Sequence, residues 1–276
     1  MIGLTKEAIA KFDINPLRLL DIIQKTNCII VGAIPMKILS GARFESDNFD
    51  LLVPASEEAT MKIYMKEAFS YQFKEAKPVF GTNRTVKSMH VFLKGDNRVN
   101  LWIAAAENAV VPLMLSHSTV VMNYISAWGI FCAYPKLTLA HRSLINHFVG
   151  DEQERNGKEA YRRLVGDYKK YAARGISFGI DATKWADISA HTCYASAYCT
   201  HSIRSMYDSG VLFIRFPART RGKDDLYGSI RYDNKHTVVW SLGGSFCGTP
   251  GSYHRAFADS KRIYPNYDLQ GFQADE

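Results

Sequence analysis

Apolar and polar residues recur in two different periods along the first part of the chain. Apolar residues at helical spacing predict a helix over 5–24, with a start near Pro16, and a short helix over 34–39. The apolar run 28–31 predicts a buried strand, and 49–53 predicts a second strand. These elements predict the order helix, strand, helix, strand.

The middle of the chain continues this alternation. A helix is predicted over 56–69 with Ser56 as its N-cap, followed by a loop or ragged hairpin over 70–86. Two strands over 89–93 and 99–103 flank a Gly-Asp-Asn turn, which predicts a hairpin.

The remaining pattern is helical first and then rich in strands. Helices are predicted over 107–117, 119–128, 139–148 and 154–173, and strands over 211–216 and 237–242. We therefore expect an α+β fold. Its core, a mixed sheet with flanking helices, spans 1–135. The part 136–276 holds a helical segment and a small β-rich region with Cys and His.

Composition is consistent with a folded protein and leaves its partners open. Of the 276 residues, 47% are hydrophobic and 12% aromatic, and the formal net charge is +7. This charge permits contact with nucleic acid or another phosphate-bearing partner. The pairs Arg162–Arg163 and Lys169–Lys170 form either a solvated helix face or a phosphate-contacting one. No apolar run reaches the length of a membrane helix, so we expect no membrane partner.

The five cysteines indicate a reducing compartment. The N-terminal segment has no apolar stretch typical of a signal peptide, so we expect an intracellular protein, in the cytoplasm or nucleus. Cys28 and Cys132 lie in apolar contexts and are predicted to be core residues.

The strongest chemical signal is a pair of polar side chains on the predicted strand 49–53. Nucleotidyl transfer uses two divalent cations, held by two carboxylates that alternate on one strand and by a third on a neighbouring strand. Here Asp50 supplies one carboxylate, whereas Asn48 stands at the alternate position and Asn100 at the third. Two lost charges predict weak magnesium binding, with the amides as neutral ligands.

Asp47 offers a replacement carboxylate. By strand alternation it points away from Asp50, but a β-bulge would turn it into the site. Asp96 in the hairpin turn is a weaker candidate, since acidic residues are common in turns.

These runs carry a resemblance to a known family. The segments 29–33 (Ile-Ile-Val-Gly-Ala), 47–54 and 99–103 resemble the polymerase-β-type nucleotidyltransferase superfamily. The runs 116–125 and 134–139 make the chain similar to uncharacterised nucleotidyltransferase-like proteins of mushroom-forming fungi. The resemblance implies a nucleotide site that includes the Gly32–Ala33 turn, where the superfamily usually has Gly-Ser. It also implies a transferase that has lost two of its three metal-binding acids.

A cluster of Cys and His residues follows in the last hundred residues. Its candidate zinc ligands are Cys193, Cys199 and Cys247, with one of His201, His191 and His254. The alternatives are buried thiols with ordinary surface histidines, and a disulfide between Cys193 and Cys199. A nucleophilic Cys247 activated by His254 is a further alternative.

Basic and aromatic residues also interleave in this part: the basic ones are Arg204, Arg215, Arg219, Arg221, Lys223 and Arg231, and the aromatic ones are Tyr207, Phe213, Phe216, Tyr227 and Tyr232. They form either a nucleic-acid surface or strands with aromatic residues inside and arginines in solvent. The run 219–223 (Arg-Thr-Arg-Gly-Lys) is the best candidate for a phosphate-contacting loop.

Three functions are open on this basis. The first is a nucleotidyltransferase-like pseudoenzyme that binds a nucleotide or phosphate-rich ligand with weak or no transfer activity. The second is a zinc-stabilised, non-catalytic interaction module. The third is an enzyme of unrelated chemistry in the same cleft.

Overall fold

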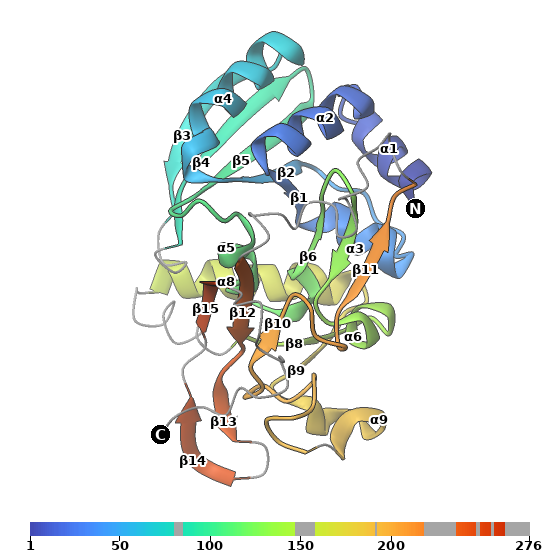
Figure 1. Cartoon of the computed structure of the whole chain (residues 1–276), viewed down its shortest axis with the longest axis vertical. Coiled ribbons are helices and arrows are strands. Elements are labelled where there is room, and N and C mark those ends of the chain that lie inside the picture. The colour runs from blue at the N-terminus through green and yellow to red at the C-terminus, as the bar shows by residue number, and fades with distance from the viewer. Residues whose placement is uncertain are drawn as a thin grey trace.

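The fold is α+β, with a mixed sheet of eight described strands at its centre (Figure 1). The computed structural model describes residues 1–79, 85–146, 158–190, 192–217, 236–246, 249–254 and 257–262. Across the sheet the strands are β11 (Leu212–Arg215), β7 (Gly129–Cys132), β6 (Asn123–Ile125), β1 (Ile29–Val31), β2 (Phe49–Val53), β5 (Asn97–Ala104), β4 (Val86–Lys94) and β3 (Gln72–Pro78). In this sheet β2 and β5 pair in parallel, and the other neighbours pair antiparallel.

One face of the sheet is covered by N-terminal helices. These are α1 (Ile2–Ala10), α2 (Pro16–Thr26) and α4 (Glu58–Ile63). Helix α2 begins at Pro16, as predicted, and the Asn15 side chain caps it by accepting a 3.0 Å hydrogen bond from the backbone nitrogen of Arg18. The helices bury Phe49, Leu51 and other apolar side chains of the strands in one core. Because these side chains face the core, the alternate residues of β2 and β5 face the opposite side of the sheet.

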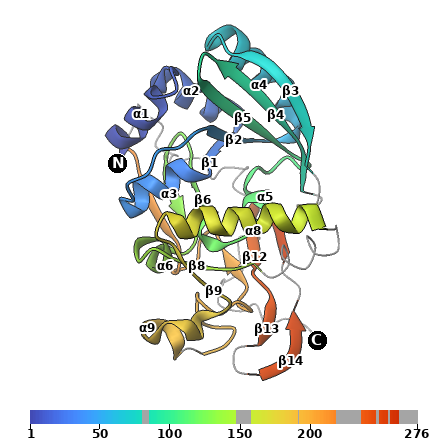
Figure 2. The same cartoon turned by 180° about the vertical axis from the view of Figure 1, so that it is seen from behind.

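The opposite face packs against later parts of the chain. The short helices α5 (Val110–Met114) and α6 (Pro135–Leu139) and the strand β12 (His236–Ser241) share a second core with apolar residues of β1, β6 and β7. Helix α8 (Lys158–Ala173) runs across the molecule between the upper sheet and the C-terminal strands (Figure 2). Helix α3 (Ala33–Ser40) connects β1 to β2.

The remaining elements form smaller units. They are α9 (Ala186–Ser189), the pair β8 (Arg142–Leu144) and β9 (Ser177–Gly179), the sheet of β10 (Arg204–Ser205), β12 and β15 (Phe257–Arg262), and the hairpin of β13 (Gly244–Phe246) and β14 (Thr249–His254). The predicted β-rich character of the C-terminal part is therefore observed. However, β11 pairs with β7, so the main sheet extends beyond the expected core of 1–135.

Several predicted elements are wrong. The predicted helix 119–128 contains a short 3₁₀ turn and the strand β6, because its buried β-branched and aromatic residues pair into the sheet. The predicted helix 139–148 gives way to the end of α6 and to β8, and His141 between them has a left-handed φ of 55°. Ser56 is not an N-cap: α4 begins at Glu58 after a 3₁₀ turn, and the Ser56 hydroxyl donates to the Glu107 carboxylate.

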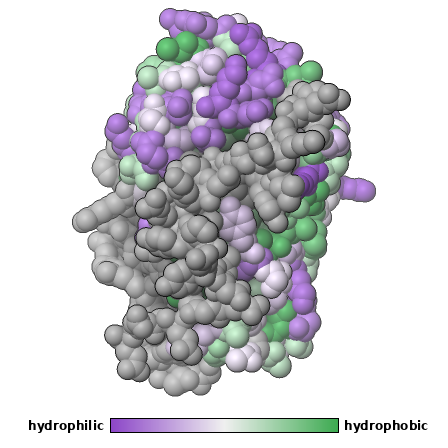
Figure 3. All heavy atoms as spheres, in the orientation of Figure 1, coloured by the Kyte–Doolittle hydropathy of each residue, from purple (hydrophilic) through white to green (hydrophobic). Residues whose placement is uncertain are grey.

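The surface around α4 and β3 is strongly polar. The space-filling view shows hydrophilic residues over this upper part of the molecule (Figure 3). The exposed Lys66, Glu67, Lys74 and Lys77 contribute to it. Because β3 is an edge strand, these charges oppose pairing with a strand of another chain.

In the described ranges, no helix combines the length and the apolar character that crossing a membrane requires.

Candidate functional site

The carboxylate of Asp50 is the centre of a hydrogen-bond network of neutral groups. Its Oδ1 accepts bonds from Asn48 Nδ2 at 3.0 Å, Asn100 Nδ2 at 2.8 Å and Trp102 Nε1 at 3.0 Å. Its Oδ2 accepts from Asn48 Nδ2 at 2.9 Å. The structure thus brings Asn48, Asp50 and Asn100 together, as the strand alternation predicts.

Strand pairing explains this convergence. Strands β2 and β5 are parallel, and Asp50 is the direct partner of Asn100 in their register. The neighbours Leu51 and Leu101 point into the core under the N-terminal helices. Alternate side chains of a strand face opposite sides, so Asp50, Asn100 and Trp102 share the other face.

Arg98 extends the network and was not identified from the sequence. Its Nε donates to Asn100 Oδ1 at 2.8 Å, which places the Asn100 oxygen toward Arg98 and the Asn100 nitrogen toward Asp50. The two terminal nitrogens of the Arg98 guanidinium have no partner among the described residues. The spacing of positions 98, 100 and 102 by two is the signal that places Arg98 and Trp102 on the face of Asn100.

Gly32 lies against the same carboxylate. It adopts φ 76° and ψ −133°, a conformation that only glycine adopts readily. A Cβ at this position would lie 3.0 Å from Asp50 Oδ2. Gly32 precedes α3, and Val31 pairs with Asp50 across β1 and β2, so the Gly32–Ala33 turn adjoins the network.

Helix α8 lies near Asp50 on the side of the sheet that the N-terminal helices do not cover. Burial raises the pKa of the Tyr171 hydroxyl, and the negative charge of Asp50 raises it further. Arg174, just after α8, stacks over the rings of Phe44 at 4.2 Å and Tyr171 at 5.4 Å. These contacts hold the end of α8 beside the loop that leads to Asn48.

The network does not fit a divalent magnesium ion. Such a cation requires several oxygen ligands, preferably anionic ones. Both amides present nitrogen to Asp50, and the oxygen of Asn100 is held by a guanidinium cation. One carboxylate surrounded by N–H donors and an arginine therefore offers a poor cation site.

Asp47 is placed elsewhere. It lies in the loop before β2 and lines a neighbouring cavity. The register of β2 and β5 is regular from Phe49 to Val53, so no bulge in this strand turns Asp47 toward Asp50. Asp96 lines the same cavity.

The Cys and His candidates are only partly described. Cys199 and His201 are buried and Cys193 is partly exposed, whereas Cys247, His191 and the side chain of His254 lie outside what the structure describes. Cys193 and Cys199 are not joined by a disulfide, so that alternative is not formed. Within the described ranges no three His, Cys, Asp or Glu side chains are grouped to hold a metal. The zinc set with Cys247 stays a prediction.

Cys28 and Cys132 are core residues, as predicted. Each is 1% exposed, and burial raises the pKa of the Cys28 thiol to about 12 and that of Cys132 to about 11. Neither thiol is suited to nucleophilic or metal chemistry at neutral pH.

Arg204 is the best-described member of the interleaved basic and aromatic residues, and it is not a surface residue. It is 2% exposed, forms a bidentate ion pair with Asp208 at 2.7 and 2.8 Å, and stacks over Tyr134 and Trp240. Arg204 therefore stabilises the interior of the fold and does not belong to a basic surface. The predicted phosphate loop 219–223 lies outside the described residues.

A serine, a histidine and a glutamate meet at α4 and β4, but not as a catalytic triad. Ser88 Oγ lies 2.9 Å from His90 Nε2, and Glu58 Oε1 lies 3.4 Å from that same nitrogen. The other ring nitrogen, Nδ1, is buried and has no hydrogen-bond partner among the residues that the structure describes. A triad needs the serine and the acid on different ring nitrogens, so this group does not fit.

A search of family models, of curated proteins and of solved structures found no match to this chain.

Proposed function

We propose that the chain is a nucleotidyltransferase-like pseudoenzyme that binds a nucleotide or another phosphate-bearing ligand without magnesium and transfers nothing. The observation that carries this proposal is the pairing of Asn100 with Asp50 in register on parallel strands, with Arg98 bonded behind it. In this interpretation the amides occupy the places of two catalytic acids.

Charge explains why a phosphate ligand is acceptable without metal. Three carboxylates would carry three negative charges and would repel a triphosphate unless cations neutralised them. Here the single negative charge of Asp50 is balanced by the positive charge of Arg98. Arg98 lies two residues before Asn100 on β5 and donates a hydrogen bond to its side chain. A phosphate group therefore meets little net repulsion.

Two parts of the site supply the binding groups. The terminal nitrogens of Arg98 are suited to a bidentate contact with phosphate oxygens. The indole of Trp102 is partly exposed while its Nε1 is held by Asp50, so its orientation is fixed for stacking with a base. Gly32 permits the close approach of the α3 turn.

Thermal stabilisation and calorimetry with the four nucleoside triphosphates and with tripolyphosphate test this function. We expect binding of equal strength in EDTA and in magnesium, and no release of pyrophosphate. Arg98→Ala should weaken binding by about ten- to a hundredfold through loss of charge-assisted hydrogen bonds. Lys25→Ala on the exposed side of α2, the helix that covers the opposite face of the sheet, is the control and should bind as the wild type.

Binding that appears only with magnesium would show that the amide network does not replace the metal. Absence of binding by any of these ligands, with the fold intact, would reject the proposal.

A further inference from the structure

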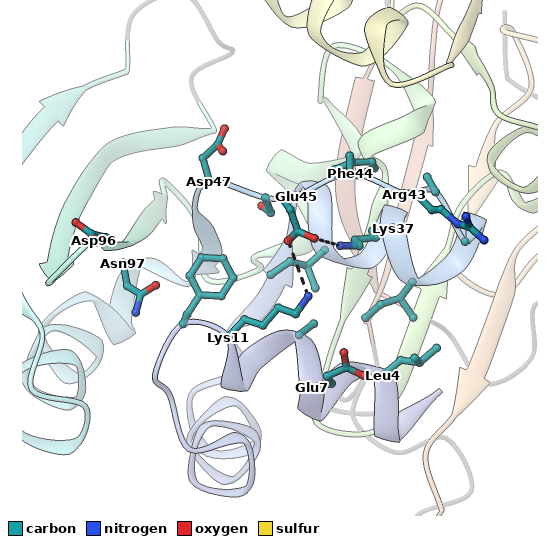
Figure 4. Close-up of a pocket in the computed structure, with 17 residues that line it drawn as sticks. Leu4, Glu7, Lys11, Lys37, Arg43, Phe44, Glu45, Asp47, Asp96 and Asn97 are labelled. Carbon is teal, nitrogen blue, oxygen red and sulfur yellow. Dashed lines mark hydrogen bonds and ion pairs between the residues drawn. The ribbon is translucent and has the colours of Figure 1, made fainter.

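A cavity of about 790 Å³ lies beside the helices α1 and α3 (Figure 4). It is bounded by α1, α3, the loop 41–47 and the turn before β5. Phe12 lines it and packs against Phe49 with ring centroids 5.3 Å apart. Because Phe49 and Asp50 are consecutive on β2, they face opposite sides of the sheet. The cavity is therefore separate from the proposed nucleotide site.

The cavity combines an apolar floor with a pair of cations. Leu4, Ala8, Phe12, Ile34 and Ile38 supply the apolar lining. Lys11 from α1 and Lys37 from α3 both reach the carboxylate of Glu45, at 3.8 and 3.4 Å. Figure 4 shows Glu45 between the two lysines, with dashed lines to each. The volume is within the range of about 300–1,000 Å³ typical of small-molecule sites.

We propose that this cavity binds an amphipathic monocarboxylate, with its apolar body on the floor and its carboxylate between Lys11 and Lys37 in the place of Glu45. The chain already shows that one carboxylate fits this position. The side chain of Glu45 is 79% exposed, and exposed ion pairs of this kind are weak, so an incoming anion can displace it.

The other charges of the lining favour a single negative charge on the ligand. Glu7, Asp47 and Asp96 also line the cavity, and among the described residues of the lining Arg43 is the one further cation. With Glu45 displaced, three acids still oppose three cations, which disfavours a polyanion such as a triphosphate. The ligand class therefore differs from that of the Asp50 site.

Calorimetric titration with decanoate, below its micelle concentration, tests this site. We expect saturable binding with one site per chain. Decanol, which lacks the charge, and decyl phosphate, which carries more of it, should both bind at least about tenfold more weakly. Equal binding of decanol, or tighter binding of decyl phosphate, would overturn the proposed preference.

Three variants separate recognition from folding. Lys37→Met should weaken decanoate about tenfold and leave decanol unchanged, because only the anion contact is lost. Glu45→Gln should strengthen decanoate by about two- to fivefold by removing the internal competitor. Lys6→Met, on α1 but outside the cavity, is the matched control. Unchanged or weaker decanoate binding in Glu45→Gln would show that Glu45 does not occupy the ligand position.

Discussion

Asn100 donates a 2.8 Å hydrogen bond from its side-chain nitrogen to Oδ1 of Asp50, its direct partner on the parallel strand β2. The bond is available only because position 100 is an amide. A carboxylate there could not donate and would face Asp50 with a like charge. The same holds for Asn48, whose Nδ2 contacts both oxygens of Asp50.

The double variant Asn48→Asp with Asn100→Asp should therefore be unstable without metal. We expect the free energy of unfolding in EDTA to fall by about 3–5 kcal/mol, from lost charge-assisted bonds and new repulsion. Magnesium should restore part of this loss, since three acids now converge on one site. Urea unfolding with EDTA or magnesium measures both effects.

Asn97→Asp is the control for the added charge. Position 97 begins β5 but has the opposite strand parity to Asn100. Its stability should depend little on magnesium. A double variant whose unfolding midpoint does not respond to magnesium would contradict the geometry of a latent three-acid site.

Gly32→Ala and Gly41→Ala form a second matched pair. Both glycines have positive φ, 76° and 68°, but an added Cβ meets Asp50 Oδ2 at position 32 and open space at position 41. We expect Gly41→Ala to cost about 1 kcal/mol from backbone strain alone. Gly32→Ala should cost about 2–4 kcal/mol, since ψ −133° is a glycine-only region and Asp50 must move. Chemical denaturation measures the loss in the free energy of unfolding for both variants. Equal losses would mean that the contact with Asp50 adds nothing to the effect of Gly32→Ala.

The elements around Asp50 could be predicted from the sequence because their signals are local. The apolar run before Gly32, the strand Phe49–Val53 and the hairpin of β4 and β5 each have a distinct pattern with turn residues at its end. Alternation on two strands then placed Asn48, Asp50 and Asn100 together. That step needed only the pairing of β2 with β5.

Other features depend on contacts between distant segments. The strands β6 and β7 were not recognised because short buried apolar runs fit a helix and a strand equally well, and only pairing of Ile125 with Ile30 decides between them. The roles of Arg98 and Trp102 were missed because a charged and an aromatic residue on a strand are ordinary. The burial of Arg204 likewise depends on Asp208 and on the distant Trp240.

Arg204→Met tests that buried ion pair. The side chain of Arg204 is 3% exposed, and it also donates to the backbone oxygens of Ala197 and Ala133. Its removal should lower the free energy of unfolding by about 3–5 kcal/mol, because Asp208 loses its cationic partner and keeps only the backbone donors of Ser205 and Gly210. Adding Asp208→Asn should recover part of this loss, as expected for residues that interact. Additive costs in a double-mutant cycle would show that the two side chains do not stabilise each other.

His117 makes the free energy of unfolding depend on pH in the acid range. Its ring lies against Tyr168 and Tyr171 of α8, with centroids 5.4 and 5.8 Å away, and its Nδ1 is 2.8 Å from the Ser118 hydroxyl. Burial, with a smaller contribution from the positive charge of Lys170, lowers the pKa of His117 from 6.5 to about 4. The folded protein therefore keeps this histidine neutral over a range in which the unfolded chain protonates it.

The sign of the effect follows from this difference. Below pH 6.5 the unfolded state binds more protons, so the free energy of unfolding falls as the pH falls toward 4, by at most about 3 kcal/mol. His117→Gln should remove this part of the slope, since glutamine does not titrate. The difference between the two proteins in urea unfolding from pH 7.5 to pH 4 isolates the contribution of His117 from that of other groups. Parallel stability curves over this range would show that His117 titrates alike in both states and is not held neutral by the contact with α8.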